Sequence, residues 1–108
     1  MSSNSPYKGE VDMTLKVGDL VGVLCLIQPG PFPDERLVTV ETGEGQISGF
    51  VKQSNLQIDA ADPERGRVKG SVVEATNDSI TVKLFGSFFT TAQGIASVRR
   101  SSLTRIAV

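Results

Sequence analysis

Short runs of apolar residues, separated by glycine and proline, make up most of this chain. The runs are rich in Val, Ile, Thr and Phe, and no apolar stretch repeats at helical spacing over three turns. Eleven glycines and five prolines in 108 residues provide the turns that many short strands need. The sequence therefore predicts an all-β protein in which helix is scarce.

Strand signals occur in both halves of the chain. A turn at Gly18-Asp19 precedes an apolar segment that continues to Ile27 and is expected to bend at Gly22, which lacks a side chain. Three prolines then make residues 28–35 a loop. Further strands are expected at 36–41, 46–51, 67–75, 80–84, 95–98 and near the C-terminal end of the sequence.

Two six-residue segments of the chain resemble each other. Val51-Lys-Gln-Ser-Asn-Leu56 and Val98-Arg-Arg-Ser-Ser-Leu103 lie 47 residues apart (98 − 51) and are identical at three positions. Upstream, Val38-Thr-Val40 matches Ile80-Thr-Val82 at an offset of 42 (80 − 38). The common order of strands and motifs predicts an internal tandem repeat. The alternative is a coincidence between two segments that are both rich in β-forming residues.

The opening Val17-Gly-Asp-Leu-Val21 and the closing Gly49-Phe-Val-Lys-Gln-Ser-Asn-Leu56 resemble SH3-like barrels in the broad sense, including bacterial SH3, KOW and Tudor-like domains. The resemblance covers most of residues 15–106, and it implies that each half ends in a strand, a short 3₁₀ turn and a final strand. Each half has only about 45 residues and would bury little surface alone. We therefore expect the halves to share a core or to associate with another chain.

These observations predict two small SH3-like half-barrels, which are curved antiparallel sheets packed together. Residues 1–10 are expected to be a flexible tail, 11–58 the first half, 59–66 a linker and 67–108 the second half. The apolar positions of the expected strands form the predicted core. Its members are Val21, Val23, Leu24, Val38, Val40, Ile47, Val72, Ile80, Val82, Leu84, Ile95 and Val98.

The residue types on which catalysis and metal binding most often depend are scarce in this chain. It contains no histidine, which removes the commonest general base and the commonest zinc ligand. Cys25 is the only cysteine, and its apolar surroundings in the sequence predict a buried structural thiol. No catalytic, cofactor-binding or metal-binding residue is predicted, and we expect a protein that is not an enzyme.

Charge and hydropathy limit the partners and the location. The formal net charge is −1, whereas domains that follow a nucleic-acid backbone usually have a basic balance. The longest apolar stretch, Leu20 to Ile27, is too short to span a bilayer. The N-terminal residues lack the basic start and the apolar middle of a secretory signal. We expect a cytoplasmic protein without membrane association.

Three phenylalanines are the candidate partner-binding residues. Phe32 lies in the stiff proline loop, where it would either anchor a partner or fold back as a plug on its own barrel. Phe88 and Phe89 are adjacent, so on a strand they would face opposite sides of the sheet. The ring that leaves the core would stack on a base, bind a peptide or fill an interface. In a symmetric oligomer, we expect one of the two rings at the interface.

Positive charge is concentrated in the second half of the chain. Arginines beside serines suit phosphate groups, although an exposed edge strand kept soluble by its charge would look the same. Arg67 and Lys69 would extend this set. The possible nucleic-acid or phosphate contacts are Lys83, Arg99, Arg100 and Arg105.

The function expected from the sequence is that of a binding or structural module. Long antiparallel strands with few prolines leave sheet edges that invite pairing with another chain. We therefore expect protein–protein contacts or self-association into a homo-oligomer. The alternative is a small nucleic-acid-binding β-barrel that uses its basic second half.

Overall fold

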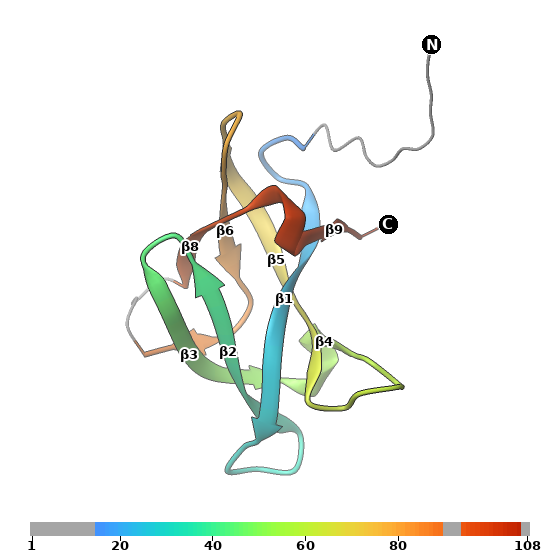
Figure 1. Ribbon diagram of the computed structural model, residues 1–108. Helices are drawn as coiled ribbons and strands as arrows, with labels where there is room; N and C mark the ends of the chain where they lie inside the picture. Colours follow the sequence, from blue (N-terminus) through green and yellow to red (C-terminus); the bar gives the residue numbers. More distant parts are fainter. Residues whose placement is uncertain (1–14, 90–93, 107–108) are drawn as a thin grey trace.

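Strands and the turns between them account for nearly all of the computed structural model, which describes residues 15–89 and 94–106 (Figure 1). The expected flexible tail, residues 1–10, lies outside the described residues. The only helical segments in the described part of the chain are two 3₁₀ turns, η2 (Gln53–Asn55) and η3 (Arg100–Ser102). The prediction of an all-β protein with scarce helix is confirmed.

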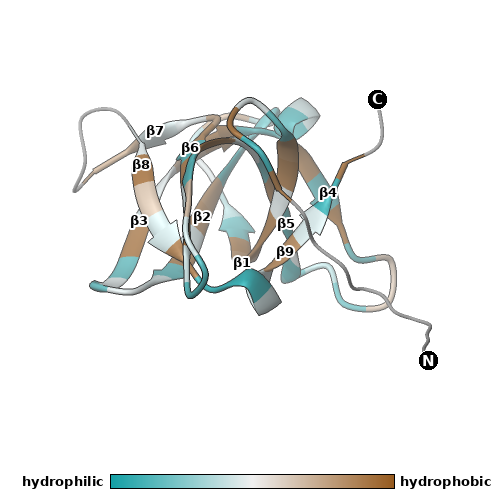
Figure 2. Cartoon of the chain, turned by 90° about the horizontal axis from the view of Figure 1, so that it is seen from above, coloured by the Kyte–Doolittle hydropathy of each residue, from teal (hydrophilic) through white to brown (hydrophobic). Residues whose placement is uncertain are grey.

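All the strands belong to one antiparallel sheet. They pair in the order β7-β3-β2-β1-β5-β6-β8, while β4 pairs with β5 and β9 pairs with β1. The sheet curls into a half-barrel around a common interior (Figure 2). Between the β2–β3 turn and β8, the Gly43 N–H donates to the Ser97 carbonyl at 2.9 Å. The strands are β1 (Leu20–Pro29), β2 (Glu35–Thr42), β3 (Gly45–Lys52), β4 (Leu56–Ile58), β5 (Arg65–Ala75), β6 (Ile80–Leu84), β7 (Ser87–Phe88), β8 (Ile95–Val98) and β9 (Leu103–Arg105).

The β1–β5 pair joins the two predicted halves. It extends from Leu20 opposite Ser71 to Leu26 opposite Arg65. Three short strands cross between the halves, because β4 pairs with β5, β9 pairs with β1 and β7 pairs with β3. Each half thereby covers part of a strand edge in the other half, and both contribute to one hydrophobic core. The expectation of a shared core is confirmed.

The two similar sequence segments have the same local geometry. Val51 near the end of β3 and Val98 at the end of β8 are both buried. A three-residue 3₁₀ turn and a three-residue strand follow each valine. The residues that precede the turns have nearly equal backbone angles, with φ −65° and ψ 140° at Lys52 and φ −75° and ψ 148° at Arg99. The origin of this similarity in a duplication stays a prediction.

The strand pairing aligns the upstream segments of the two halves differently from the match of sequence letters, with a shift of two residues. Gly49 and Ala96, which lie 47 residues apart, are opposite Val38 in β2 and Val82 in β6 respectively. By register Val38 corresponds to Val82, at an offset of 44 (82 − 38), whereas the match of sequence letters aligns it with Ile80 at an offset of 42. Both alignments are possible because apolar residues alternate at Ile80, Val82 and Leu84, so the two valines of 38–40 fit either pair.

The predicted core is correct apart from two side chains. Leu24 and Ile95 point away from it, with 46% and 40% of their surface exposed. The reason is strand alternation, since Val23 and Cys25 on either side of Leu24 face inward. Ile47 is partly buried and packs against the core. The buried apolar side chains are Leu15, Val21, Val23, Cys25, Ile27, Val38, Val40, Val51, Val68, Val72, Ile80, Val82, Leu84, Phe88, Ala96, Val98 and Leu103.

A glycine lets the short strand β7 pair closely with β3. A Cβ on Gly49 would collide with the Ser87 carbonyl oxygen and would lie 2.6 Å from Phe88 Cα. Because Gly49 has no side chain, β7 can pair with β3 at Gly49–Phe88 and Phe50–Ser87. This close approach fixes the sides of the sheet on which Phe88 and its neighbour Phe89 lie.

The opposite orientations of Val23 and Leu24 can be tested by alanine substitution. We expect Val23→Ala to lower the free energy of unfolding by about 2 kcal/mol, because it leaves a cavity in the core. Leu24→Ala should cost less than about 1 kcal/mol, because that side chain is half exposed in the native state. Urea unfolding followed by circular dichroism measures both values. Equal losses for the two variants would contradict the inward and outward assignments.

Candidate functional site

An exposed aromatic pair lies at the β3–β7 edge of the sheet. Phe88 is 6% exposed and belongs to the core, whereas Phe89 is 61% exposed. The Phe89 ring packs edge to face against Phe50, with ring centroids 5.2 Å apart and planes at 73°. The Phe89 N–H donates to the Ser48 carbonyl at 2.9 Å, which fixes the backbone beneath the ring. We call Phe50 and Phe89 the aromatic edge.

The different burial of the two adjacent phenylalanines shows which ring leaves the core. The expectation that they face opposite sides is confirmed, and Phe89 is the ring that leaves the core. Phe88 was predicted as a partner-binding residue, and its burial contradicts that role. Its ring is buried because Phe88 lies opposite Gly49, where the missing side chain leaves room for it.

Phe32 lies in the loop between β1 and β2 and is 62% exposed. Its carbonyl accepts the Glu35 N–H at 3.1 Å, so the loop closes on itself by a short turn. The exposed ring excludes the interpretation of Phe32 as a plug on its own barrel. Phe32 is therefore available to a partner, on a loop that is separate from the aromatic edge.

Two of the four basic residues that were expected to contact phosphate or nucleic acid interact with other residues of the chain. Arg100 Nη2 donates to the Thr76 carbonyl at 2.7 Å and so fastens η3 to the β5–β6 hairpin. Arg105 Nη2 lies 3.1 Å from Asp19 Oδ2 and forms an ion pair. Both guanidinium groups thus stabilise the connections between elements.

The other two of these basic residues, Lys83 and Arg99, are exposed and lie at different ends of the β6–β8 pair. Lys83 is opposite Ile95 at the start of β8, and Arg99 follows Val98 at its end. At about 3.3 Å per residue, three residues along a strand separate these ends by roughly 10 Å. The fold therefore spreads the predicted cations over several elements.

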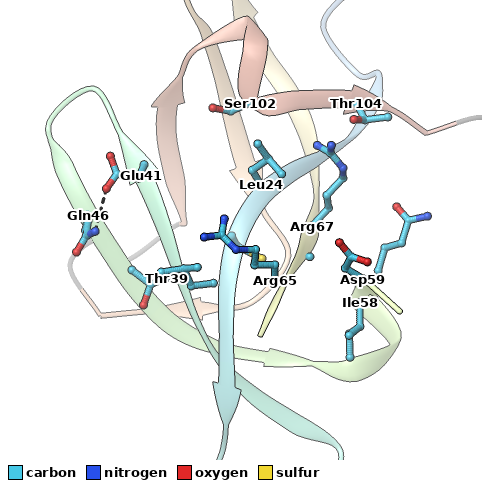
Figure 3. A pocket seen from close by; sticks show the side chains of 14 residues that line it. Leu24, Thr39, Glu41, Gln46, Ile58, Asp59, Arg65, Arg67, Ser102 and Thr104 are labelled. Atoms are coloured by element: carbon cyan, nitrogen blue, oxygen red, sulfur yellow. Dashed lines mark hydrogen bonds between the residues drawn. The ribbon is translucent and has the colours of Figure 1, made fainter. Parts of the chain in front are cut away.

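A groove on the side of the sheet that faces away from the core was not foreseen. We call it the outer groove, and it encloses about 760 Å³ (Figure 3). Leu24 and Leu26 of β1, both 46% exposed, form an apolar floor beside two arginines of β5. Its lining residues are Leu24, Cys25, Leu26, Thr39, Glu41, Gln46, Gln57, Ile58, Asp59, Arg65, Gly66, Arg67, Ser102 and Thr104.

Arg67 is the most unusual side chain in the outer groove. Its stem crosses β1 at Gly22, where an added Cβ would lie 3.2 Å from both Cβ and Cδ of Arg67. Its Nη1 is buried and has no hydrogen-bond partner among the described residues. In Figure 3 the side chain extends past Leu24 towards Thr104. A buried guanidinium nitrogen without a partner is costly, so this group has an unused capacity to bind an acceptor.

Sequence reasoning missed the outer groove because it placed Leu24 in the core. The available signal was the alternation in residues 21–27, which puts Leu24 and Leu26 on the face opposite to Val23 and Cys25. Gly22 was a second signal, since a strand glycine often marks a close approach by another group. Here that group is the stem of Arg67.

Cys25 is a buried thiol, as predicted. Burial raises its pKa to about 12 from an ordinary value of 9.0, and the positive charge of Arg67 opposes part of that rise. The thiol is therefore neutral at physiological pH, and nucleophilic chemistry at this position is suppressed. No cluster of acidic or cysteine side chains that could hold a metal ion occurs in residues 15–89 and 94–106.

The raised pKa of Cys25 predicts slow modification and a pH-dependent stability. We expect the native thiol to react with an aromatic disulfide reagent at pH 8 at least about a hundredfold more slowly than in urea. Because the folded pKa lies above the unfolded one, the stabilising effect is complete below pH 9 and is lost as pH rises to 12. Unfolding of the native chain and of Cys25→Ala across this range measures the difference. Rapid native modification would contradict the burial.

The structure thus offers two surfaces suited to binding, the aromatic edge and the outer groove. In its described part, no helix has the length and hydrophobicity of a membrane span. Comparison of the chain with protein-family models, with curated proteins and with solved structures found no match.

Proposed function

We propose that this protein is a non-enzymatic binding module that acts through protein–protein contacts at the aromatic edge. The observation that carries the proposal is the exposure of Phe89 on a fixed backbone, with its ring already packed against Phe50. A ring held in place loses little conformational freedom when a partner covers it. Rigid aromatic side chains of this kind commonly contribute most of the binding energy at an interface.

The surroundings of the aromatic edge support contact with a second copy of the chain. β7 is at one end of the strand order, so an edge of the sheet lies next to Phe89. Across the sheet, Ser48 is opposite Thr39, and their hydroxyl groups hydrogen-bond at 2.9 Å, so the residues beside the aromatic edge are uncharged. The net charge of −1 produces little repulsion between identical copies.

Nucleic-acid binding is the alternative function, and fewer observations support it. Of the four predicted basic contacts, Arg100 and Arg105 make intramolecular contacts and only Lys83 and Arg99 are simply exposed. Phosphate recognition depends on several cations that can replace the counterions of the backbone. The overall negative charge also opposes such an encounter.

Self-association can be measured by sedimentation velocity from about 5 to about 200 micromolar protein, a range suited to weak interfaces. We expect concentration-dependent association of the wild-type chain, weakened about tenfold or more by Phe89→Ala. Phe32→Ala is the matched control, because it removes an equally exposed ring from another loop. A monomer throughout the range would contradict self-association, and a larger effect of Phe32→Ala would place the contact on the proline loop.

The nucleic-acid alternative has its own test. Labelled single- and double-stranded oligonucleotides are titrated at about 50 and about 200 mM salt, because phosphate contacts make affinity depend on salt. We expect no micromolar binding, and no change on replacing Lys83 and Arg99 by glutamine. Micromolar, salt-sensitive binding that the double substitution abolishes would favour the alternative function over the proposed one.

A further inference from the structure

The buried Arg67 Nη1 in the outer groove lacks an acceptor. None of the described residues accepts a hydrogen bond from it, although burial has removed it from water. Leaving a charged donor unpaired in this way is unfavourable, and an anionic oxygen is the acceptor that a guanidinium binds most strongly. Arg67 also lines the groove, so its guanidinium would stabilise a negatively charged group bound there.

The other charged side chains that line the outer groove already have partners. Arg65 Nε lies 3.3 Å from Asp62 Oδ2. Glu41 Oε2 accepts a hydrogen bond from Gln46 Nε2 at 2.8 Å. Asp59 Oδ1 accepts the Ala61 N–H at 2.9 Å. Glu41 and Asp59 keep their negative charges, so what distinguishes Arg67 among the described lining residues is a buried donor without an acceptor.

A second cation lies near Arg67. Lys69 is two residues further along β5, so its side chain is on the same face of the strand. Arg67 and Lys69 both line an adjoining cavity of about 390 Å³. The positive charge of Lys69 adds to that of Arg67 at this end of the groove and further favours an anion.

Apolar surface begins directly beside the cation. In the β1–β5 ladder, Leu24 is opposite Arg67, and Leu26 is opposite Arg65. Both leucine side chains are half exposed and form the groove floor. A ligand whose anionic group meets Arg67 would therefore cover these leucines with whatever lies next to that group. Burial of their exposed surface favours an apolar chain or ring at this position.

The size and backbone of the groove favour a small ligand over a peptide strand. Its volume of about 760 Å³ lies within the range of small-molecule sites. At its floor, β1 and β5 pair with each other, and their other edges are occupied by β2 and β9 and by β4 and β6. Most of both strand edges is therefore paired already, which leaves little room for an extended peptide to add as a strand.

From this juxtaposition we propose that the outer groove binds a small organic anion with an apolar chain or ring. Arg67 would hold the anionic group, and Leu24 and Leu26 would contact the apolar part. The site is separate from the aromatic edge, so the inference goes beyond the proposed function and does not depend on it.

Three matched probes test the inference. Octanoate carries a carboxylate and an apolar chain, octanol carries the chain without the charge, and inorganic phosphate carries charge without the chain. Binding is followed by the methyl signals of Leu24 and Leu26 in two-dimensional carbon–proton NMR spectra. We expect a saturable shift with octanoate and affinities at least about tenfold lower for the other two probes. Equal binding of octanol would show a merely apolar site, and equal binding of phosphate a site for charge alone; either result would overturn the proposal.

Variants then identify the group that binds the anion. We expect Arg67→Gln to weaken octanoate binding about tenfold or more, and Arg67→Lys to retain part of it. Gly22→Ala keeps the charge but places a Cβ 3.2 Å from the Arg67 stem, which must then shift, and it should also weaken binding. Arg99→Gln is the control, because it removes the same charge from an exposed position outside the groove. Unchanged affinity in both Arg67→Gln and Gly22→Ala would overturn the proposal.

Each variant is first shown to be folded by its circular dichroism spectrum. Repeating the octanoate titration in Phe89→Ala separates this inference from the proposed function, because that substitution leaves the outer groove intact. Octanoate binding by a monomeric Phe89→Ala protein would support the groove site whatever the outcome of the association experiment. Loss of octanoate binding in Phe89→Ala alone would place the probe at the aromatic edge and would overturn the assignment to Arg67.

Discussion

The antiparallel pairing of β1 with β5 is the interaction on which the rest of the structure depends. It is the longest contact between the two halves, and the buried pair of Val23 and Val68 lies at its centre. The short strands β4 and β9 attach to these two strands from the opposite halves. Neither half has enough residues for a large core, and sharing one sheet lets both bury their apolar side chains in a common interior.

This shared core leaves one face of the central strands for recognition. The inward positions of β1 and β5 are filled by small and branched apolar residues, so exposed features must come from the alternate positions. On β1 these positions include Leu24 and Leu26, and on β5 they include Arg65, Arg67 and Lys69. The outer groove arises because these two rows lie side by side in the ladder. The aromatic edge has a different origin, since it depends on the close approach of β7 to β3 at Gly49.

Local sequence rules predicted a residue of the candidate site only where the direction of its side chain depends on a single element. Adjacent phenylalanines on a strand must diverge, and Phe89 follows that rule once Phe88 is buried. The roles of Arg100 and Arg105 were beyond such rules, because their acceptors lie more than twenty residues away in Thr76 and in Asp19. A sequence shows that these side chains are positively charged. It does not show which carbonyl or carboxylate the folded chain will place beside them.

The sequence by itself determined the strand class, the turns and the burial of most core valines. These properties follow from side-chain alternation and from backbone limits at glycine and proline, which act within a few residues. Only the tertiary structure decided that Leu24 is exposed, that Arg67 crosses Gly22, and that both belong to one groove. The physical reason is that a strand has two faces of which either can be buried, and the choice depends on long-range pairing and sheet curvature.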